Sequence, residues 1–242
     1  MKRPPSRITA TWIVVTWMIF QWFAMQGLAL AGQSQDAAAR KPNPAFAKIV
    51  DDSKLPHVLL IGDSISIGYT VPVGEALKGK ANVHRAPVNC GPTVRGLEQL
   101  DDWLAGGKWD VIHFNWWLHD LKHVDGKHQI PIDWYESNLR TLVGRLNKTG
   151  ARLIWCATTP VPKGPLSPPR TDEDVRAYNR VAEAIMRDNR IEINDLYRFA
   201  RGKLKEIQRK TNVHFTPSGS KVLAEEVAQH IFKPREGPPA DK

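Results

Sequence analysis

The fold is decided by residues 59–64, which read Leu-Leu-Ile-Gly-Asp-Ser. They close a short apolar run over residues 57–61 that is typical of a buried strand and ends at Gly62. Apolar residues at helical spacing then follow over residues 65–77. This stretch therefore predicts a strand that passes directly into a helix, with Ser64 at the junction.

The alternation of strands and helices continues along the chain. We expect further strands at residues 83–88, 111–115, 153–157 and 191–193. Helices are expected at 94–104, 134–146, from about 171, over the basic stretch 198–210, and at 217–232. Strands separated by helices predict an α/β fold, a three-layer αβα sandwich around a parallel five-stranded sheet. Ligand sites of such sheets lie at the carboxyl ends of the strands.

The ends of the chain differ from this domain, which we place at residues 55–233. Residues 1–31 combine Lys2, Arg3 and Arg7 with an acid-free apolar run and end in Ala29-Leu30-Ala31, as an export signal cleaved after Ala31 does. This predicts a periplasmic or extracellular protein. Because the run is long, a retained membrane anchor is the alternative. Residues 32–54 are expected to be a linker and residues 234–242 a flexible tail.

Charge and cysteine content limit the possible partners. The net charge of +9 falls to +6 without the three cations of the signal, and the remaining cations are scattered, so no nucleic-acid partner is expected. A membrane partner is expected only if the N-terminal segment is retained. Cys90 and Cys156 are expected to be buried free thiols, although export permits a disulfide between them.

Two residues far apart in the sequence suggest nucleophilic catalysis. Ser64 would meet free backbone amides and the positive end of a helix dipole, which favour a developing anion, although a serine there can also be a simple N-cap. His214 lies in Asn212-Val213-His214-Phe215-Thr216-Pro217, just before a helix that Thr216 can cap. A histidine at that place can serve as the base that a serine nucleophile needs.

Three blocks of sequence resemble the SGNH (GDSL-like) hydrolases. The blocks are Gly62-Asp63-Ser64, Asn89-Cys90-Gly91-Pro92-Thr93 and residues 212–219, and the resemblance spans about residues 56–232. It implies the flavodoxin-like SGNH hydrolase fold and ester hydrolysis without a cofactor. It also implies that Ser64 is the nucleophile and His214 the base. The backbone amide of Gly91 would then contribute to the oxyanion hole, together with that of Ser64.

Two positions depart from the family pattern. His119, in Trp117-Leu118-His119-Asp120, occupies the place of the usual oxyanion-hole asparagine. Its imidazole N–H can donate to an oxyanion, and Asn115 is the alternative donor. The usual acid, three residues before His214, is absent, since Thr211 stands there. We expect Asn212 or a backbone carbonyl to orient the imidazole, with Asp120 as the alternative carboxylate.

Other residues near these positions carry weaker signals. Asp63 and Asp120 could suggest a metal site together with His113, His119 and His123, but the spacing of these residues matches no zinc motif, so no metal is expected there. Trp116 and Trp117 follow the third expected strand, and an aromatic ring there could stack on a sugar. A position in the core is the other interpretation of both tryptophans.

The sequence therefore predicts an exported serine esterase that hydrolyses small acyl esters, acetyl above all, through a Ser-His acyl-enzyme. The substrate is expected to be a small-molecule or polysaccharide ester. Three alternatives remain open at this point. They are a carbohydrate O-acetyltransferase, a catalytically impaired sugar-binding module of the same fold, and a membrane-tethered structural protein.

Overall fold

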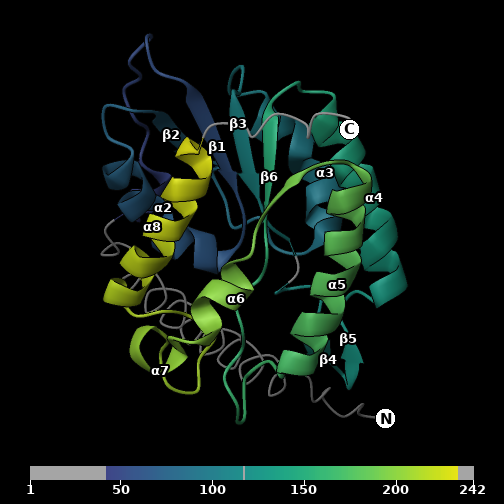
Figure 1. The fold of residues 1–242 in the computed structure, drawn as a ribbon. Helices are drawn as coiled ribbons and strands as arrows, with labels where there is room; N and C mark the ends of the chain where they lie inside the picture. The colour runs from purple at the N-terminus through teal and green to yellow at the C-terminus, as the bar shows by residue number, and fades with distance from the viewer. Residues whose placement is uncertain (1–41, 117, 234–242) are drawn as a thin grey trace, which may run out of the picture. The chain divides into compact units, whose positions relative to one another are not determined.

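The domain is built around a parallel sheet of five strands in the order β2-β1-β3-β6-β7 (Figure 1). The computed structural model describes residues 42–116 and 118–233. The strands are β1 (His57–Ile61), β2 (Asn82–Arg85), β3 (Val111–Phe114), β6 (Arg152–Cys156) and β7 (Glu192–Asn194). In the central register Leu59 pairs with His84 on one side and with Ile112 on the other. The predicted five-stranded parallel sheet is confirmed.

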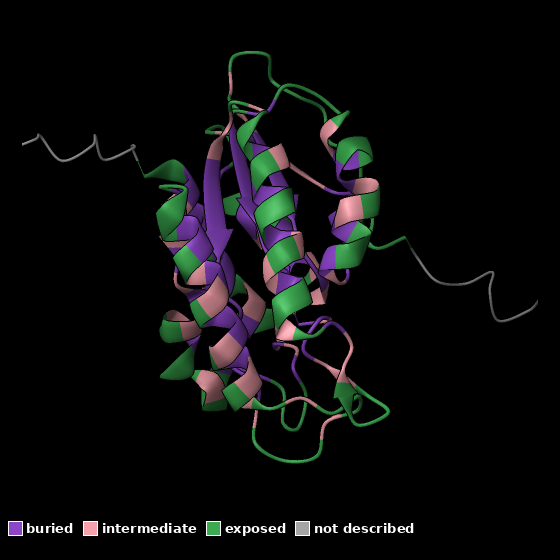
Figure 2. Cartoon of the chain, turned by 90° about the vertical axis from the view of Figure 1, so that its right-hand side faces the viewer, coloured by how far each residue is buried: buried purple, intermediate pink, exposed green. Residues whose placement is uncertain are grey.

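Helices cover both faces of this sheet (Figure 1). One face carries α2 (Ser64–Ala76), α6 (Leu196–Arg201), α7 (Leu204–Ile207) and α8 (Pro217–Phe232), and the other carries α3 (Thr93–Leu104), α4 (Ile132–Asn147) and α5 (Asp172–Asp188). Successive strand residues face opposite layers, so Val58 packs with the α2 and α8 side chains and Leu59 with those of α3 and α4. Figure 2 shows buried strands between helices whose outer faces are exposed. The predicted three-layer sandwich is confirmed.

The structure departs from the expected elements at two places. The basic helix expected over 198–210 is divided into α6 and α7. A small antiparallel hairpin, β4 (His123–Val124) and β5 (Lys127–His128), was not predicted. Its turn consists of Asp125 and Gly126, both with positive φ. An Asp-Gly pair is a known signal for such a turn, so the sequence did contain this information.

The segment before β1 belongs to the domain from Asn43 onward. The 3-10 helix η1 (Pro44–Phe46) packs against α2. Further along, the buried Asn82 side chain accepts a hydrogen bond from the Asp52 amide and donates to the carbonyls of Asp52 and Leu55. Asn82 and α2 thus hold part of the stretch that the sequence analysis assigned to a linker, residues 32–54.

The remaining expectations concern the thiols and the chain ends. Cys90 and Cys156 are both buried and free, as expected, and burial raises the pKa of the Cys90 thiol to about 12. Within residues 42–233, as far as they are described, no helix has the length and apolar character needed to cross a bilayer. The expected signal, its cleavage point and the tail lie outside the described residues.

Candidate active site

Ser64 lies at the junction between β1 and α2, where the sequence places it. Asp63 is the N-cap of α2, since its Oδ1 accepts a hydrogen bond from the Ile65 amide at 2.9 Å. Ser64 is thus the first residue inside the helix and not its cap, which removes the N-cap interpretation. Its hydroxyl is 2.9 Å from Nε2 of His214, a residue 150 positions later in the chain.

The loop that carries His214 is held in place on both sides. An isolated antiparallel bridge joins Gln208 to Phe215, and the Arg209 amide donates to the His214 carbonyl at 3.0 Å. Thr216 then caps α8, as predicted, by accepting the Gly219 amide at 2.9 Å. A Cβ atom on Gly219 would lie 2.0 Å from the Ile207 carbonyl oxygen, so this close approach of α8 requires glycine. The histidine therefore approaches Ser64 on a fixed backbone.

Asn212 orients the imidazole of His214. Its Oδ1 accepts the backbone N–H of His214 at 2.9 Å and lies 2.7 Å from Nδ1 of the same residue. Because a backbone N–H can only donate, the atom facing His214 is an acceptor, and Nδ1 must carry the proton. Nε2 is then free to accept the proton of Ser64, which is the tautomer that a general base needs.

The Asp63 carboxylate acts on the histidines around Ser64. Burial lowers the pKa of His214 below its ordinary value, and the negative charge of Asp63 opposes this effect. The pKa of His119 is also lowered by burial and raised by Asp63. A lowered pKa keeps His214 neutral, and therefore basic, at neutral pH. Among the described residues Oδ2 of Asp63 is buried and has no hydrogen-bond partner.

The loop that contains Gly91 lies directly against the Ser64 junction. The Cys90 amide donates to the Gly62 carbonyl at 3.2 Å, and Gly91 has a φ of 59°, in the left-handed region that favours glycine. The Gly91 amide donates to Oδ1 of Asn89 at 3.0 Å. An oxyanion must therefore displace this side-chain acceptor before Gly91 can stabilise it. His119 lies half-buried in the turn after β3.

The two alternative residues belong to other hydrogen-bond networks. The Asn115 amide is buried and donates to the Cys156 carbonyl at 2.7 Å and to Oγ1 of Thr158 at 3.0 Å. Asp120 accepts the amide and hydroxyl of Thr93 at the start of α3, and burial raises the pKa of its carboxyl to about 6. These bonds turn Asn115 away from the oxyanion role and Asp120 away from the role of triad acid.

Trp116 is a core residue and does not line the site. It is fully buried, and its ring stacks on Trp103 with centroids 6.4 Å apart. A Cβ on Gly96 would come within 2.9 Å of the indole, so α3 is closely packed onto this ring. The core interpretation of Trp116 is therefore confirmed, and the alternative, stacking on a sugar, does not fit its burial. Trp117 lies outside the described residues.

The histidines considered for a metal near Asp63 and Asp120 are dispersed. His113 is buried in β3, where Asn194 donates to its Nε2 at 3.3 Å and burial lowers its pKa to about 3. His123 lies in the β4-β5 hairpin, with Nε2 3.1 Å from Asp174. The neutral core position of His113 and the carboxylate partner of His123 explain both residues without a metal.

Arg85, at the end of β2, was not predicted to belong to the site. Its guanidinium donates to the Gly62 carbonyl at 3.0 Å, to Oγ of Ser66 at 2.9 Å and to Oγ1 of Thr70 at 3.0 Å. These bonds fix the β1-α2 junction from the neighbouring strand. No local motif marks this residue, because its partners come from another part of the chain.

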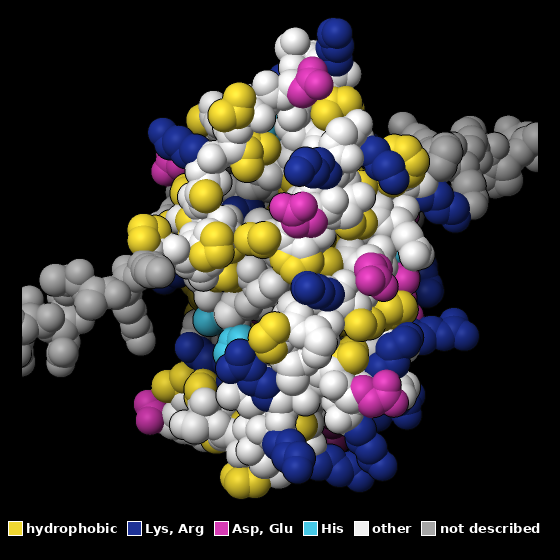
Figure 3. Space-filling view, turned by 90° about the vertical axis from the view of Figure 1, so that its left-hand side faces the viewer, with side chains coloured by type: hydrophobic (Ala, Val, Ile, Leu, Met, Phe, Trp, Pro, Cys, Tyr) yellow, Lys and Arg dark blue, Asp and Glu magenta, His cyan; other side chains and the backbone are white. Residues whose placement is uncertain are grey.

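A cleft of about 520 Å³ opens beside Ser64 between α2 and α8. Its lining is apolar at Ile67, Pro72 and Phe215 and basic at Arg209 and Lys221. Figure 3 looks onto this side of the domain and shows histidine atoms at the surface beside Lys and Arg side chains. The Ser64-His214 pair is therefore accessible to a ligand from solvent.

Solved structures with the same architecture identify the fold. No protein-family model matches the sequence, and no curated protein is significantly similar to it. A putative SGNH hydrolase from Slackia heliotrinireducens, 18% identical, superposes with a TM-score of 0.57 over 73% of this chain and 99% of its own. This chain has the SGNH hydrolase fold. 

Two further structures with the SGNH hydrolase fold are similar to this chain. A lipase/acylhydrolase from Enterococcus faecalis is 21% identical and has a TM-score of 0.63, over 75% of this chain and 100% of its own. An acetylxylan esterase from Geobacillus stearothermophilus is 18% identical and has a TM-score of 0.59, over 73% of this chain and 94% of its own. At these identities the similarity shows the fold alone, and the chemistry must be argued from the site.

Proposed function

We propose that this chain is a serine esterase whose nucleophile is Ser64 and whose general base is His214. The observation that supports the proposal is the hydrogen-bonded series from Oγ of Ser64 through the imidazole to Oδ1 of Asn212. This series has the tautomer and the distances of an activated nucleophile. It lies at the carboxyl ends of the strands, beside an open cleft.

The proposed reaction has two steps. Oγ of Ser64 attacks the ester carbonyl while His214 takes the hydroxyl proton, and collapse of the tetrahedral intermediate returns this proton to the leaving alcohol. Water, deprotonated by the same imidazole, then releases the acid from the acyl-serine. The amides of Ser64 and Gly91 and the His119 ring stabilise the oxyanion, Gly91 after its bond to Asn89 is broken.

The substrate that we propose is a small acyl ester, acetyl above all, carried by a carbohydrate. Acetylxylan esterases share the fold, and the cleft beside Ser64 combines apolar side chains for an acyl group with cations for a polar partner. We also propose that the enzyme acts outside the cytoplasm, with residues 1–31 as its export signal. Its chemistry needs no cofactor.

Hydrolysis of p-nitrophenyl acetate, butyrate and octanoate tests the proposal. We expect turnover that is fastest for acetate, and a loss of kcat by at least about 1,000-fold in Ser64→Ala. Ser218→Ala is the matched control, since it removes a hydroxyl from the exposed first turn of α8 and should leave kcat unchanged. A fluorophosphonate probe should label the wild type and the control but not Ser64→Ala.

Turnover that persists in Ser64→Ala would refute the nucleophile assignment. Faster hydrolysis of octanoate than of acetate would refute the small-acyl substrate and leave the Ser-His mechanism standing. Localisation is tested separately by fractionating cells that express the full chain. Recovery of the protein in the cytoplasm with residues 1–31 intact would contradict export.

A further inference from the structure

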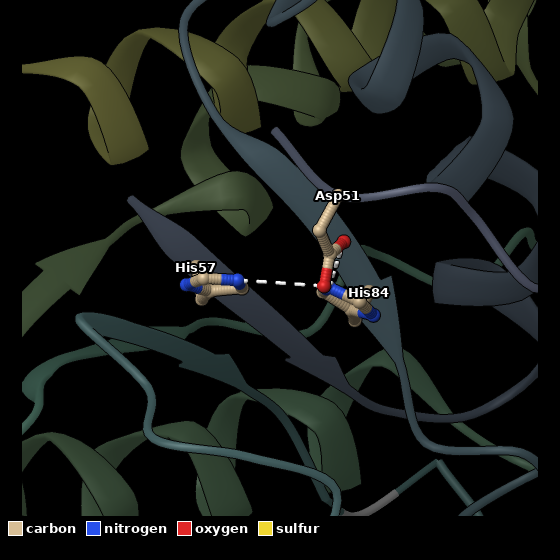
Figure 4. Close-up of side chains that lie close together, drawn as sticks. All are labelled: Asp51, His57 and His84. Atoms are coloured by element: carbon tan, nitrogen blue, oxygen red, sulfur yellow. Dashed lines mark ion pairs between the residues drawn. The ribbon is translucent and has the colours of Figure 1, made fainter. Parts of the chain in front are cut away.

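A second group of chemically active side chains lies at the opposite edge of the sheet. Asp51, His57 at the start of β1 and His84 in β2 converge on one another (Figure 4). Nε2 of His57 is 3.4 Å from one carboxylate oxygen of Asp51, and Nε2 of His84 is 2.9 Å from the other. We refer to these three residues as the amino-edge cluster.

The contacts within this cluster are not ordinary hydrogen bonds. Among the described residues Nε2 of His84 is buried and has no hydrogen-bond partner, although a carboxylate oxygen lies only 2.9 Å away. The ring nitrogen and the oxygen are therefore close without the N–H pointing at the oxygen. One atom from each residue lies within 4.8 Å of the others, so that three potential ligand atoms surround a common point.

These separations match those of atoms that bind one metal ion. With bonds of about 2.0 to 2.2 Å, two ligands of a tetrahedral zinc ion lie roughly 3.3 to 3.5 Å apart. The 3.4 Å contact lies in this range, and the 2.9 Å contact is about 0.4 Å shorter, so a small separation of the Asp51 and His84 side chains would admit an ion. Two imidazoles and one carboxylate form a donor set that suits Zn²⁺ and its neighbours in the first transition row, and not Mg²⁺ or Ca²⁺, which prefer oxygen.

The cluster is also held in place by its surroundings. Asn82 binds the backbone of Asp52 and Leu55, which fixes the turn that follows Asp51. Asp110 accepts the His57 amide at 2.8 Å, and its carboxylate is 4.0 Å from Nδ1 of that ring. At 4.0 Å the Asp110 carboxylate is beyond hydrogen-bond distance of the ring, so it fixes the His57 backbone and adds only its charge near the imidazole.

A similar group in the β4-β5 hairpin is explained without a metal. It consists of His123, His128 and Asp174. Asp174 accepts a hydrogen bond from Oγ1 of Thr171 at 2.6 Å and one from Nε2 of His123 at 3.1 Å. Its backbone amide is bonded to the same threonine in the N-terminal cap of α5. Nε2 of His128 lies 2.9 Å from the other Asp174 oxygen and, like Nε2 of His84, has no hydrogen-bond partner among the described residues. The difference is that Asp174 also belongs to the cap of α5. Asp51, by contrast, contacts only the two imidazoles among the described residues.

We propose that Asp51, His57 and His84 bind one divalent transition-metal ion of the Zn²⁺ class. The ion would join the segment before β1 to β1 and β2, and it would complete its coordination with water. Ser64 lies seven positions after His57, and most of the residues between them are in an extended strand, so the two sites are roughly 20 Å apart. The ion therefore stabilises the fold and takes no part in ester hydrolysis.

Metal binding to the full chain, purified without a histidine tag and stripped with EDTA, tests the proposal. Titration with Zn²⁺ should show one equivalent bound at this site, and Co²⁺ should give the absorption of a four-coordinate ion. At a free Zn²⁺ concentration of 100 times Kd, Tm should rise by about 5 to 10 °C. Asp51→Asn and His84→Gln should each weaken binding by at least about 100-fold.

His128→Gln is the matched control and should still bind one equivalent of Zn²⁺ at the amino-edge cluster. Both cluster variants should keep the metal-free Tm and the wild-type hydrolysis of p-nitrophenyl acetate, which separates loss of the ion from misfolding. A wild-type chain that binds no stoichiometric Zn²⁺ would overturn the proposal and leave a group of ion pairs. Binding that is lost in His128→Gln but kept in Asp51→Asn would overturn it as well.

Discussion

Replacement of Asn212 by aspartate should change the pH dependence of the proposed esterase activity in a defined way. Oδ1 of Asn212 already accepts the Nδ1–H of His214 at 2.7 Å and its backbone N–H at 2.9 Å. Asn212→Asp keeps the shape of the side chain and both acceptor bonds. It adds one negative charge beside the ring that becomes positive when it takes the Ser64 proton.

The size of the effect follows from the exposure of the pair. Two unit charges about 4 Å apart attract by about 1 kcal/mol in water and about 4 kcal/mol near a protein surface. Since Asn212 is exposed and His214 half-buried, we take about 1.5 kcal/mol. This corresponds to a shift of about one pH unit in the titration of His214 and to about tenfold in kcat/KM at pH 8.

The assay is the pH profile of kcat/KM for p-nitrophenyl acetate. Neutral His214 is the active form, so activity falls as pH decreases through its pKa, which burial holds below the ordinary histidine value. In Asn212→Asp this acid limb should move to higher pH, so that kcat/KM rises above the limb and falls below it. Asn147→Asp, the same change at an exposed position of α4, should leave both the limb and kcat/KM unchanged.

A profile of Asn212→Asp that coincides with the wild type, at the same maximal rate, would refute the orienting role of Asn212. A lower rate at every pH with an unmoved limb would refute the electrostatic reasoning. That second result would mean that the carboxylate turns away from the ring.

Three further predictions concern stability. Gly219→Ala should destabilise the fold by about 3 kcal/mol or more and lower Tm by roughly 6 °C or more, because its Cβ would lie 2.0 Å from the Ile207 carbonyl; an unchanged Tm would contradict this packing. Trp116→Ala should cost about 3 to 5 kcal/mol in urea unfolding, as a buried aromatic residue does, whereas a change confined to KM would restore a role in substrate binding. The folded-state pKa of Asp120, about 6, lies above its unfolded value, so its contribution to stability is present below about pH 4 and lost as pH rises through 6. Asp120→Asn should therefore gain about 2 to 3 kcal/mol relative to wild type between pH 4 and 7, and a parallel pH dependence of unfolding in the two proteins would contradict this.

The fold could be predicted because its signals are local. Buried parallel strands read as short apolar runs, and the glycine and cap residues between them mark where each strand passes into a helix. Thr216 and Pro217 predicted the start of α8, and Gly62 predicted the end of β1. The predicted bounds of an element were in error by a few residues where no glycine or cap residue marks its end, as at the end of β2.

The details of the site could be predicted less well because they depend on contacts between distant segments. The sequence left two interpretations of Trp116 open, a core position and a place at the site, and the packing of α3 through Gly96 decides for the core. The hydrogen bonds of Asn115 depend on β6, and those of Arg85 depend on α2. Such partners appear only when the sheet order is known. Asn212 was accessible to sequence reasoning because its partner is two residues away.

Asn212 contacts the imidazole where a triad usually has a carboxylate, and the carboxylate of Asp63 lies next to the proposed nucleophile, Ser64. Asn212 fixes the tautomer of His214 but brings no charge to the imidazolium that forms during attack. Asp63 supplies a charge to this ring, since it caps α2 through Oδ1 and keeps Oδ2 buried without a hydrogen-bond partner among the described residues. Its charge raises the pKa of His214 against the effect of burial. In the proposed mechanism, orientation and charge, which one aspartate supplies in a complete triad, are thus divided between Asn212 and Asp63.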